Sequence, residues 1–212
     1  MKKQLFLLLA FVMTGAVAMA QNAGVWMVGG TFGISTSKTS YTHENVTQVR
    51  EKQMDFNIIP SLHYFVTDEI AIGAGLGYEF SKALTDVEDD LYNRTGLMVF
   101  RPSMYYYVKL SDKFYYNPEL YIGLKFGNAK SEVDENTTYK MGYNRFEIGV
   151  NVLNFEFRPT DHVGLGITCG NLSYVNDKMK DVPTGAVKYD IKTSEFRFRL
   201  QDSFAFTFRY LF

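Results

Sequence analysis

Few residues of this sequence have the types and spacing needed for catalysis. His63 and Ser61 are two positions apart, so on a strand they would share one face, as a base and a hydroxyl nucleophile must for acyl transfer. The other histidines, His43 and His162, are expected in a loop and at a turn. We expect His63 and Ser61 both to face an enclosed interior. The sequence therefore favours a protein that is not an enzyme.

Two further features could bind or react with a ligand. An acidic run comprises Asp86, Glu88, Asp89 and Asp90, but it lacks the glycine and the final glutamate of a calcium-binding loop, so we interpret it as a solvated acidic loop. The single cysteine, Cys169, has no partner for an internal disulfide and is expected to behave as a small apolar residue. We expect no metal and no cofactor.

The most informative charged residues alternate with apolar ones. They carry both signs and are Glu79, Arg101, Glu119, Lys125 and Arg209. Side chains alternate across a strand, so these residues occupy the polar face of predicted strands. Charges withdrawn from water must be paired. The pattern predicts a network of ion pairs and tyrosines inside the fold.

The stretch Glu195–Phe212 shows most clearly what kind of element positions these charges. Its even positions are mostly aromatic, among them Phe206, Phe208 and Tyr210, and its odd positions are mostly polar, among them Arg209. A helix would mix the two sets around its circumference. The period of two predicts a strand about three times longer than the usual ~5–6 residues.

The same alternation occurs in seven earlier segments. The eight predicted strands are Gly24–Thr36, Gln53–Val66, Ile70–Ser81, Gly96–Lys109, Phe114–Gly127, Tyr143–Arg158, Val163–Tyr174 and Glu195–Phe212. The sixth changes parity, which a β-bulge near Val152 would reconcile. Short turns at Thr67-Asp68, Ser111-Asp112 and Thr160-Asp161 alternate with long polar loops at Ser37–Lys52, Lys82–Arg94, Asn128–Gly142 and Val175–Thr193.

Composition and the N-terminus place this pattern outside the cytoplasm. The chain of 212 residues has 18 Phe and 15 Tyr, which favours β structure. Residues 1–20 have the basic start, apolar run and Ala18-Met19-Ala20 site of a signal peptide, cleaved after Ala20. The mature domain, 21–212, then has 20 basic and 23 acidic residues, and this balance does not indicate nucleic-acid binding.

Three features indicate that the apolar faces point outward. The polar faces combine glycines, such as Gly73 and Gly75, with long charged side chains, as the narrow interior of an eight-stranded barrel requires. Aromatic residues gather near the short turns, as at a membrane interface. The strands are also longer than a soluble sandwich needs. We therefore predict an all-β, eight-stranded antiparallel up-and-down transmembrane β-barrel with short periplasmic turns and long extracellular loops.

The chain resembles the small eight-stranded outer-membrane barrels of diderm bacteria, the OmpA/OmpX-type and related porin-like family. The resemblance rests on the signal peptide, the segment Pro60–Glu69 with Gly73-Ala74-Gly75, and the terminal segment Phe206–Phe212. It implies location in the outer membrane and contact with outer-membrane lipid. It also implies that Phe208, Tyr210 and Phe212 form a C-terminal assembly signal read by the outer-membrane insertion machinery.

Several functions remain open at the level of sequence. The favoured one is a structural or loop-mediated interaction role for a barrel whose polar lumen is filled by side chains. The alternatives are a narrow channel for small solutes, an enzyme acting on lipid A or phospholipid through His63, and a secreted soluble β-barrel.

Overall fold

A computed structural model of the chain describes residues 23–43, 46–86, 91–134, 137–184, 187–199 and 205–212. The predicted signal peptide, residues 1–20, lies outside these ranges, as do Glu88–Asp90 of the acidic run. The described residues form eleven strands and no helix. The strands are β1 (Trp26–His43), β2 (Val46–Phe65), β3 (Ile70–Asp86), β4 (Leu91–Tyr106), β5 (Val108–Ser111), β6 (Phe114–Tyr116), β7 (Glu119–Asp134), β8 (Thr137–Phe157), β9 (Val163–Thr184), β10 (Val187–Arg199) and β11 (Ala205–Leu211).

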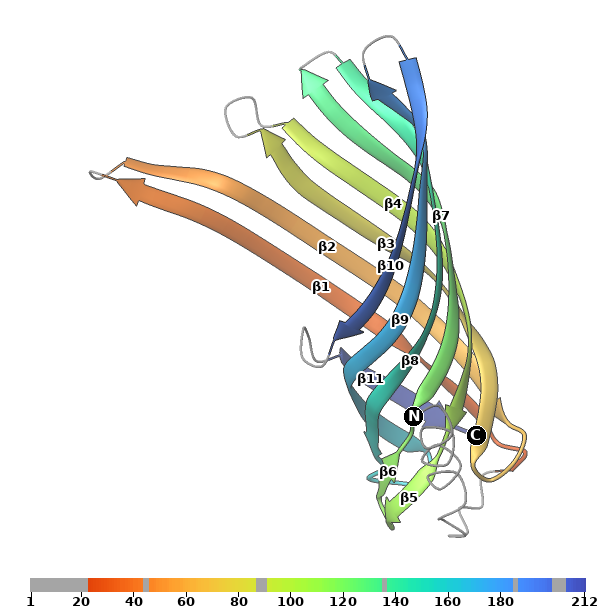
Figure 1. The fold of residues 1–212 in the computed structure, drawn as a ribbon. Coiled ribbons are helices and arrows are strands. Elements are labelled where there is room, and N and C mark those ends of the chain that lie inside the picture. The colour runs from red at the N-terminus through yellow and green to blue at the C-terminus, as the bar shows by residue number, and fades with distance from the viewer. Residues whose placement is uncertain (1–22, 44–45, 87–90, 135–136, 185–186, 200–204) are drawn as a thin grey trace, which may run out of the picture.

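The strands close into a barrel with eight positions (Figure 1). Antiparallel pairing runs from β1 through β2, β3, β4, β7, β8, β9 and β11, and β11 pairs with β1 again over Met27–Thr31. β10 and β11 both pair with β9, along different halves of it, and together fill the eighth position. β5 and β6 form a short hairpin that continues β4 and β7. The predicted fold class is therefore confirmed.

The three short turns lie where the sequence places them, at one end of the barrel. The hydroxyl of Thr67 accepts hydrogen bonds from the backbone N–H groups of Glu69 and Ile70 at 3.2 and 3.0 Å. Thr160 accepts one from Val163 at 3.2 Å. Such side-chain bonds to the local backbone are the reason these residue types favour turns.

The long polar stretches differ from the prediction, because they are mostly strand and not irregular loop. β1 continues to His43 and β2 begins at Val46, and β9 and β10 likewise continue to Thr184 and from Val187. The stretches Lys82–Arg94 and Asn128–Gly142, which were also predicted to be loops, likewise begin and end in strand. These hairpin extensions project from the opposite end to the turns, and the β1–β2 hairpin leans away from the others (Figure 1).

The last predicted strand is divided in the structure. β10 already begins at Val187, and residues 200–204 lie outside the described ranges before β11 starts at Ala205. Strands four and five are interrupted as well, since Tyr107 and Asn117-Pro118 separate the β5–β6 hairpin from β4 and β7. Pro118 has no N–H to donate, which accounts for one of these breaks.

The predicted change of parity in the sixth strand is present in β8. Glu147, Gly149 and Asn151 face inward, whereas beyond Val152 the buried residues are Asn154, Glu156 and Arg158. β9 changes parity opposite this point, at Gly170, which has φ +96°. Because both neighbours shift together, the pairing between β8 and β9 keeps one register across the irregularity.

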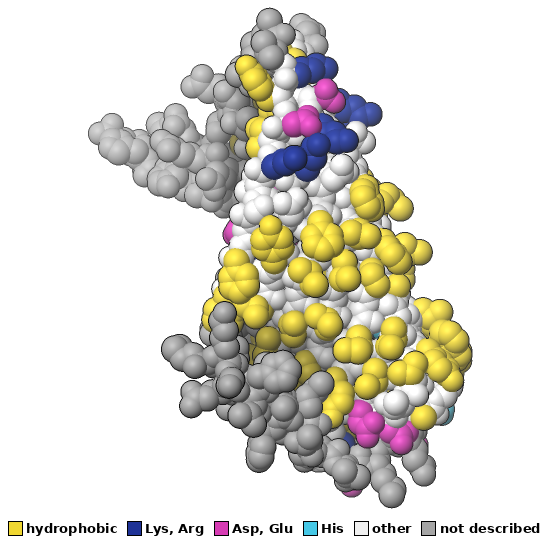
Figure 2. Space-filling view, turned by 45° about the vertical axis from the view of Figure 1, so that its right-hand side comes forward, with side chains coloured by type: hydrophobic (Ala, Val, Ile, Leu, Met, Phe, Trp, Pro, Cys, Tyr) yellow, Lys and Arg dark blue, Asp and Glu magenta, His cyan; other side chains and the backbone are white. Residues whose placement is uncertain are grey.

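The outward face of the barrel is an apolar belt (Figure 2). Phe206 and Phe208 are 73% and 57% exposed, and outward Leu76, Met98 and Phe126 are also more than half exposed. An apolar surface of this size in water would be an aggregation site, whereas in a bilayer it is covered by lipid acyl chains. In the described ranges, no helix is long and apolar enough to cross a membrane.

Candidate functional site: the barrel lumen

The turn end of the lumen is closed by a cluster of apolar and aromatic side chains, which we call the plug. Its members are Met27, Phe65, Ala71, Tyr105, Tyr107, Tyr115 and Leu211. The rings of Tyr107 lie 5.1 Å from that of Phe65 and 6.1 Å from that of Tyr115, at tilted or edge-on angles. The plug residues come from β1, β2, β3, β4, β6 and β11 and from Tyr107, so nearly every wall of the barrel contributes to it.

At the centre of the plug is the carboxylate of Glu156, which is fully buried. Its two oxygens accept hydrogen bonds from Arg158 Nε at 2.6 Å, Arg209 Nη1 at 2.5 Å and the Tyr107 hydroxyl at 3.0 Å. One carboxylate thus faces two guanidinium groups. Paired and hydrogen-bonded charges of this kind can be kept away from water.

Aromatic rings stabilise both of these arginine side chains. The guanidinium carbon of Arg158 lies 4.4 Å from the ring centre of Tyr115 and 5.0 Å from that of Tyr107, and that of Arg209 lies 4.8 Å from the ring centre of Tyr105. The negative face of an aromatic ring attracts a cation at this distance, more strongly when the pair is desolvated. The plug is therefore held by electrostatic as well as apolar contacts.

Glycines of β9 make room for these long side chains. A Cβ atom on Gly164 would lie 2.8 Å from Oε1 of Glu156, and one on Gly166 would lie 2.9 Å from Nη1 of Arg209. Small residues beside large charged ones therefore fill the narrow interior, as the sequence pattern indicates.

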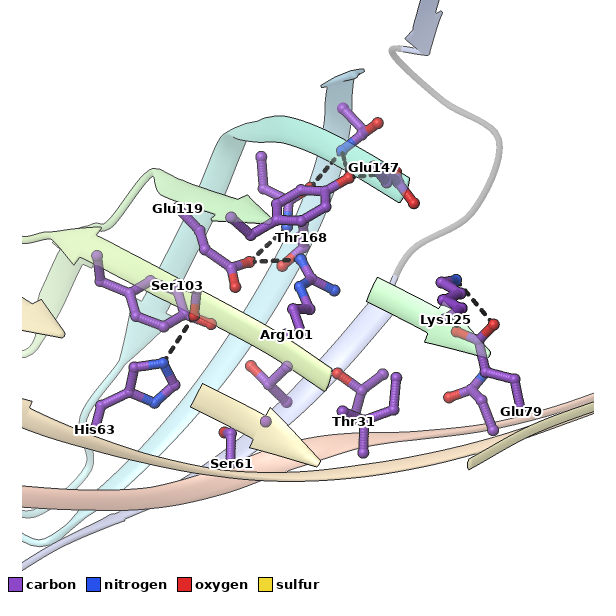
Figure 3. Close-up of a pocket in the computed structure, with 18 of the residues that line it drawn as sticks. Thr31, Ser61, His63, Glu79, Arg101, Ser103, Glu119, Lys125, Glu147 and Thr168 are labelled. Atoms are coloured by element: carbon purple, nitrogen blue, oxygen red, sulfur yellow. Dashed lines mark hydrogen bonds and ion pairs between the residues drawn. The ribbon is translucent and has the colours of Figure 1, made fainter. Parts of the chain in front are cut away.

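The structure brings the predicted lumenal residues together in pairs (Figure 3). Lys125 Nζ lies 2.8 Å from both carboxylate oxygens of Glu79, and Arg101 Nη2 lies 3.0 Å from Oε2 of Glu119. The fifth residue, Arg209, pairs with Glu156 within the plug. The Lys125–Glu79 and Arg209–Glu156 pairs join residues 46 and 53 positions apart, which spacing alone does not reveal.

Amides and tyrosines connect these ion pairs. Asn151 donates to Glu119 at 2.6 Å, Asn171 donates to Asn151 and to the Tyr121 hydroxyl, both at 2.9 Å, and Tyr121 donates to Glu147 at 2.6 Å. The ring of Tyr121 also lies 3.9 Å from the guanidinium carbon of Arg101. Nearer the hairpin end, Arg145 binds Asp177 at 2.6 Å.

A polar cavity of about 500 Å³ lies above the plug. Its walls include Glu79, Lys125, Arg145 and Arg197 toward the hairpin end, and His63 and Arg209 toward the plug. The cavity is therefore lined by both signs of charge and bounded on the turn side by the buried Glu156 cluster.

The candidate catalytic pair is not formed. His63 is 2% exposed, and its Nε2 lies 2.8 Å from the hydroxyl of Ser103 rather than that of Ser61. Cys169 is a free, partly buried thiol. Across the described segments, no group of three or more His, Cys, Asp or Glu residues could hold a metal ion.

Sequence reasoning missed Glu156 and Arg158, the buried ion pair that the plug surrounds. Their parity opposes that of Glu147 and Asn151 because of the bulge, so the first half of the strand assigns them to the lipid face. The signal that could identify them is the later run Leu153, Phe155 and Phe157, whose outward parity implies that the residues between are inward.

Two residues of the predicted assembly signal lie on the outer face of β11, and the third, Phe212, follows directly after that strand. Phe208, Tyr210 and Phe212 are all exposed, and the rings of Tyr210 and Phe212 are stacked 6.3 Å apart. The backbone of Phe212 exchanges hydrogen bonds of 2.9 Å with that of Trp26, so the end of the chain is joined to β1.

The family to which the chain belongs follows from a comparison with protein-family models. Residues 5–210 match the family described as "Outer membrane protein beta-barrel domain". Similar solved structures include Neisserial surface protein A (NspA), with TM-score 0.40, 11% identity and coverage of 89% of this chain and 97% of that chain. They also include the outer membrane protease OmpT from Escherichia coli, with TM-score 0.34, 11% identity and coverage of 93% and 96%. No curated protein matches the sequence. Because the family match spans nearly the whole chain, this protein belongs to the outer membrane protein beta-barrel domain family and is located in the outer membrane.

Proposed function

We propose that this protein is a plugged, non-catalytic barrel that serves a structural role or presents its hairpin extensions to partners outside the membrane. The observation that supports this proposal is the buried Glu156 with Arg158, Arg209 and Tyr107, packed among the plug rings. An eight-stranded barrel has an interior just wide enough for side chains. Here those side chains fill the lumen across its width at the turn end.

The energetics of the plug favour a permanent closure over a gate that opens freely. Removing one partner of a buried ion pair typically costs about 3–5 kcal/mol, because the remaining charge is left unpaired. Opening a path for ions would separate Glu156 from two guanidinium groups and also break the ring contacts. We therefore expect the closed state to dominate.

Planar-bilayer recording tests the proposal. The wild-type barrel should show no large, stable conductance steps. Tyr107→Ala removes a central ring of the plug and should produce steps, whereas Tyr106→Ala, the neighbouring residue whose side chain faces the other way, should stay silent. Large stable steps from the wild-type protein, or no difference between the two variants, would contradict a closure made by the plug.

A narrow channel for small solutes is the second candidate. The observation that favours it is the 500 Å³ cavity above the plug, whose walls carry both signs of charge. Liposome swelling separates the two functions, since a channel would admit small sugars or amino acids and a plugged barrel would exclude them.

We also propose that the exposed terminal residues Phe208, Tyr210 and Phe212 are read by the insertion machinery before the barrel closes. Support comes from their outward position at the strand that seals the barrel against β1. Replacing Phe212 and Tyr210 with serine should reduce the amount of protein assembled in the outer membrane, measured by heat-dependent gel mobility. Unchanged assembly in cells would contradict this role.

A further inference from the structure

Four cations form a continuous row across the outer face of the hairpin extensions. Lys82 of β3 lies directly opposite Arg94 of β4, Arg94 lies opposite Lys130 of β7, and Lys130 lies opposite Lys140 of β8. All four share the outward parity of the belt residues Tyr78, Met98, Phe126 and Phe146 on their own strands. We call Lys82, Arg94, Lys130 and Lys140 the basic row.

Such a row is unfavourable unless an anion accompanies it. Residues directly opposite on antiparallel strands have Cβ atoms about 4.5–5.5 Å apart, and like charges at this distance destabilise the sheet. One carboxylate, Glu132, lies 2.8 Å from Arg94. Lys82 is placed over the ring of Tyr92 at 3.7 Å. Among the side chains that the structure describes, Lys130 and Lys140 have no carboxylate partner.

The height of the row matches a lipid headgroup layer. Lys130 lies four residues beyond the belt residue Phe126, and Arg94 lies four residues beyond Met98. Four residues span roughly 13 Å along a strand, or about 9 Å along the membrane normal at a ~45° tilt. The headgroup and interfacial layer on each side of a bilayer is about 5–8 Å thick, so the backbone of the row lies at its outer edge and the long Lys and Arg side chains can reach back into it. Figure 2 shows Lys and Arg side chains gathered above the apolar belt, with a few acidic side chains among them.

A groove at this position could hold a headgroup. It has a volume of about 530 Å³ and is lined by the first three cations of the row and by Tyr78, Phe80 and Gly96. Gly96 makes room for the Tyr78 ring in the groove, because a Cβ atom at Gly96 would collide with the Tyr78 hydroxyl. The groove thus combines cations at its outer edge with aromatic rings at the edge of the belt, which suits a phosphate joined to an acyl-bearing body.

We propose that the basic row binds the phosphate groups of a phosphorylated lipid in the leaflet at the hairpin end. The occupant follows from charge complementarity: Lys and Arg bind phosphate through charge-assisted hydrogen bonds. Its lipid body follows from the position of the groove directly above the apolar belt. This site lies on the outer wall and does not depend on whether the lumen is plugged.

Native mass spectrometry of the whole barrel in neutral detergent, titrated with lipid A as the phosphorylated lipid, tests the proposal. Each cation beside an anionic lipid surface strengthens binding about fivefold. Lys82→Gln with Lys130→Gln should therefore weaken lipid A binding about thirtyfold. The matched control, Lys109→Gln with Lys113→Gln, removes two lysines from the turn end and should leave binding unchanged. Heat-dependent gel mobility verifies that both variants are folded.

Two further binding experiments, with dephosphorylated lipid A and with inorganic phosphate, identify the source of the phosphate. Dephosphorylated lipid A should bind the wild type as weakly as lipid A binds the double variant, and millimolar inorganic phosphate should not displace lipid A. Equal weakening by the control pair would show attraction by overall charge and would overturn the proposal. Displacement by inorganic phosphate, or binding of dephosphorylated lipid A at full strength, would overturn the assignment to a phosphorylated lipid.

Discussion

At the scale of single residues, stability depends most on Glu156. Replacing it with glutamine leaves Arg158 and Arg209 buried without their carboxylate, and we expect a loss of about 3–5 kcal/mol in the free energy of unfolding. Urea unfolding in lipid vesicles, followed by the fluorescence of Trp26, measures it. Glu195→Gln is the control, since Glu195 is exposed and pairs with Arg197 at 2.8 Å, and the loss of a pair at the surface should change the free energy of unfolding little. Similar losses for both variants would contradict the central role of Glu156.

Gly164 provides a second test at this scale. A methyl group there would meet Glu156 atoms at 2.8 and 2.9 Å, and the carboxylate cannot shift without breaking its bonds to two arginines. Gly164→Ala should therefore destabilise the barrel by about 1–3 kcal/mol, as overpacking does. At Gly142 the same methyl group would lie at an ordinary 3.5 Å from Lys180 Cβ, so Gly142→Ala should be nearly neutral in the same unfolding assay. Equal effects would show that the plug tolerates repacking.

At the scale of elements, the paired irregularity of β8 and β9 determines which residues enter the lumen. Without the parity change near Val152, Asn154 and Glu156 would face lipid. Gly170, opposite Val152 with φ +96°, allows β9 to follow. A side chain is strained in this conformation, so Gly170→Ala should cost about 1–3 kcal/mol. Gly123→Ala, in a regular strand with its Cβ 3.4 Å from Glu147 Cβ, should not. A smaller loss at Gly170 than at Gly123 would count against the shared bulge.

Strands are predictable from the sequence where one face of the strand meets lipid and the other face meets the lumen. The strand predicted at Gln53–Val66 is correct for that reason, and the Thr67-Asp68 turn is correct because the Thr67 hydroxyl binds the local backbone. Beyond the belt, as in Ser37–Lys52, both faces are polar and the alternation disappears. Strand pairing continues there through backbone hydrogen bonds, which leave no pattern in side-chain type. The hairpin extensions were therefore mistaken for loops.

Contacts across the lumen were only partly predictable. The parity of Glu79 and Lys125 places both inside, but their pairing depends on barrel closure, because the two residues are 46 positions apart in sequence. Glu156 and Arg158 are not predicted as lumenal, because the parity of the first half of their strand assigns both to the lipid face and the change near Val152 reverses it. A register error of one residue exchanges the two faces of a strand.

At the scale of the whole molecule, the described residues form one closed wall with an apolar outside and a charged, hydrogen-bonded inside. The plug closes the lumen at the turn end, the cavity lies above it, and the hairpin extensions carry the basic row beyond the belt. The structural role, the conductance and the lipid site are separate proposals that share this orientation of the two faces.

Quenching of the single tryptophan tests this orientation most directly. Trp26 is on the outer face near the turn end, 43% exposed, with its ring 4.9 Å from that of Tyr64. In proteoliposomes, lipids brominated near the headgroup should quench its fluorescence strongly, lipids brominated at the acyl-chain ends should quench it less, and aqueous iodide should quench it weakly. Strong quenching by iodide with none from either brominated lipid would show that water, not lipid, surrounds the aromatic face, and would contradict the membrane barrel.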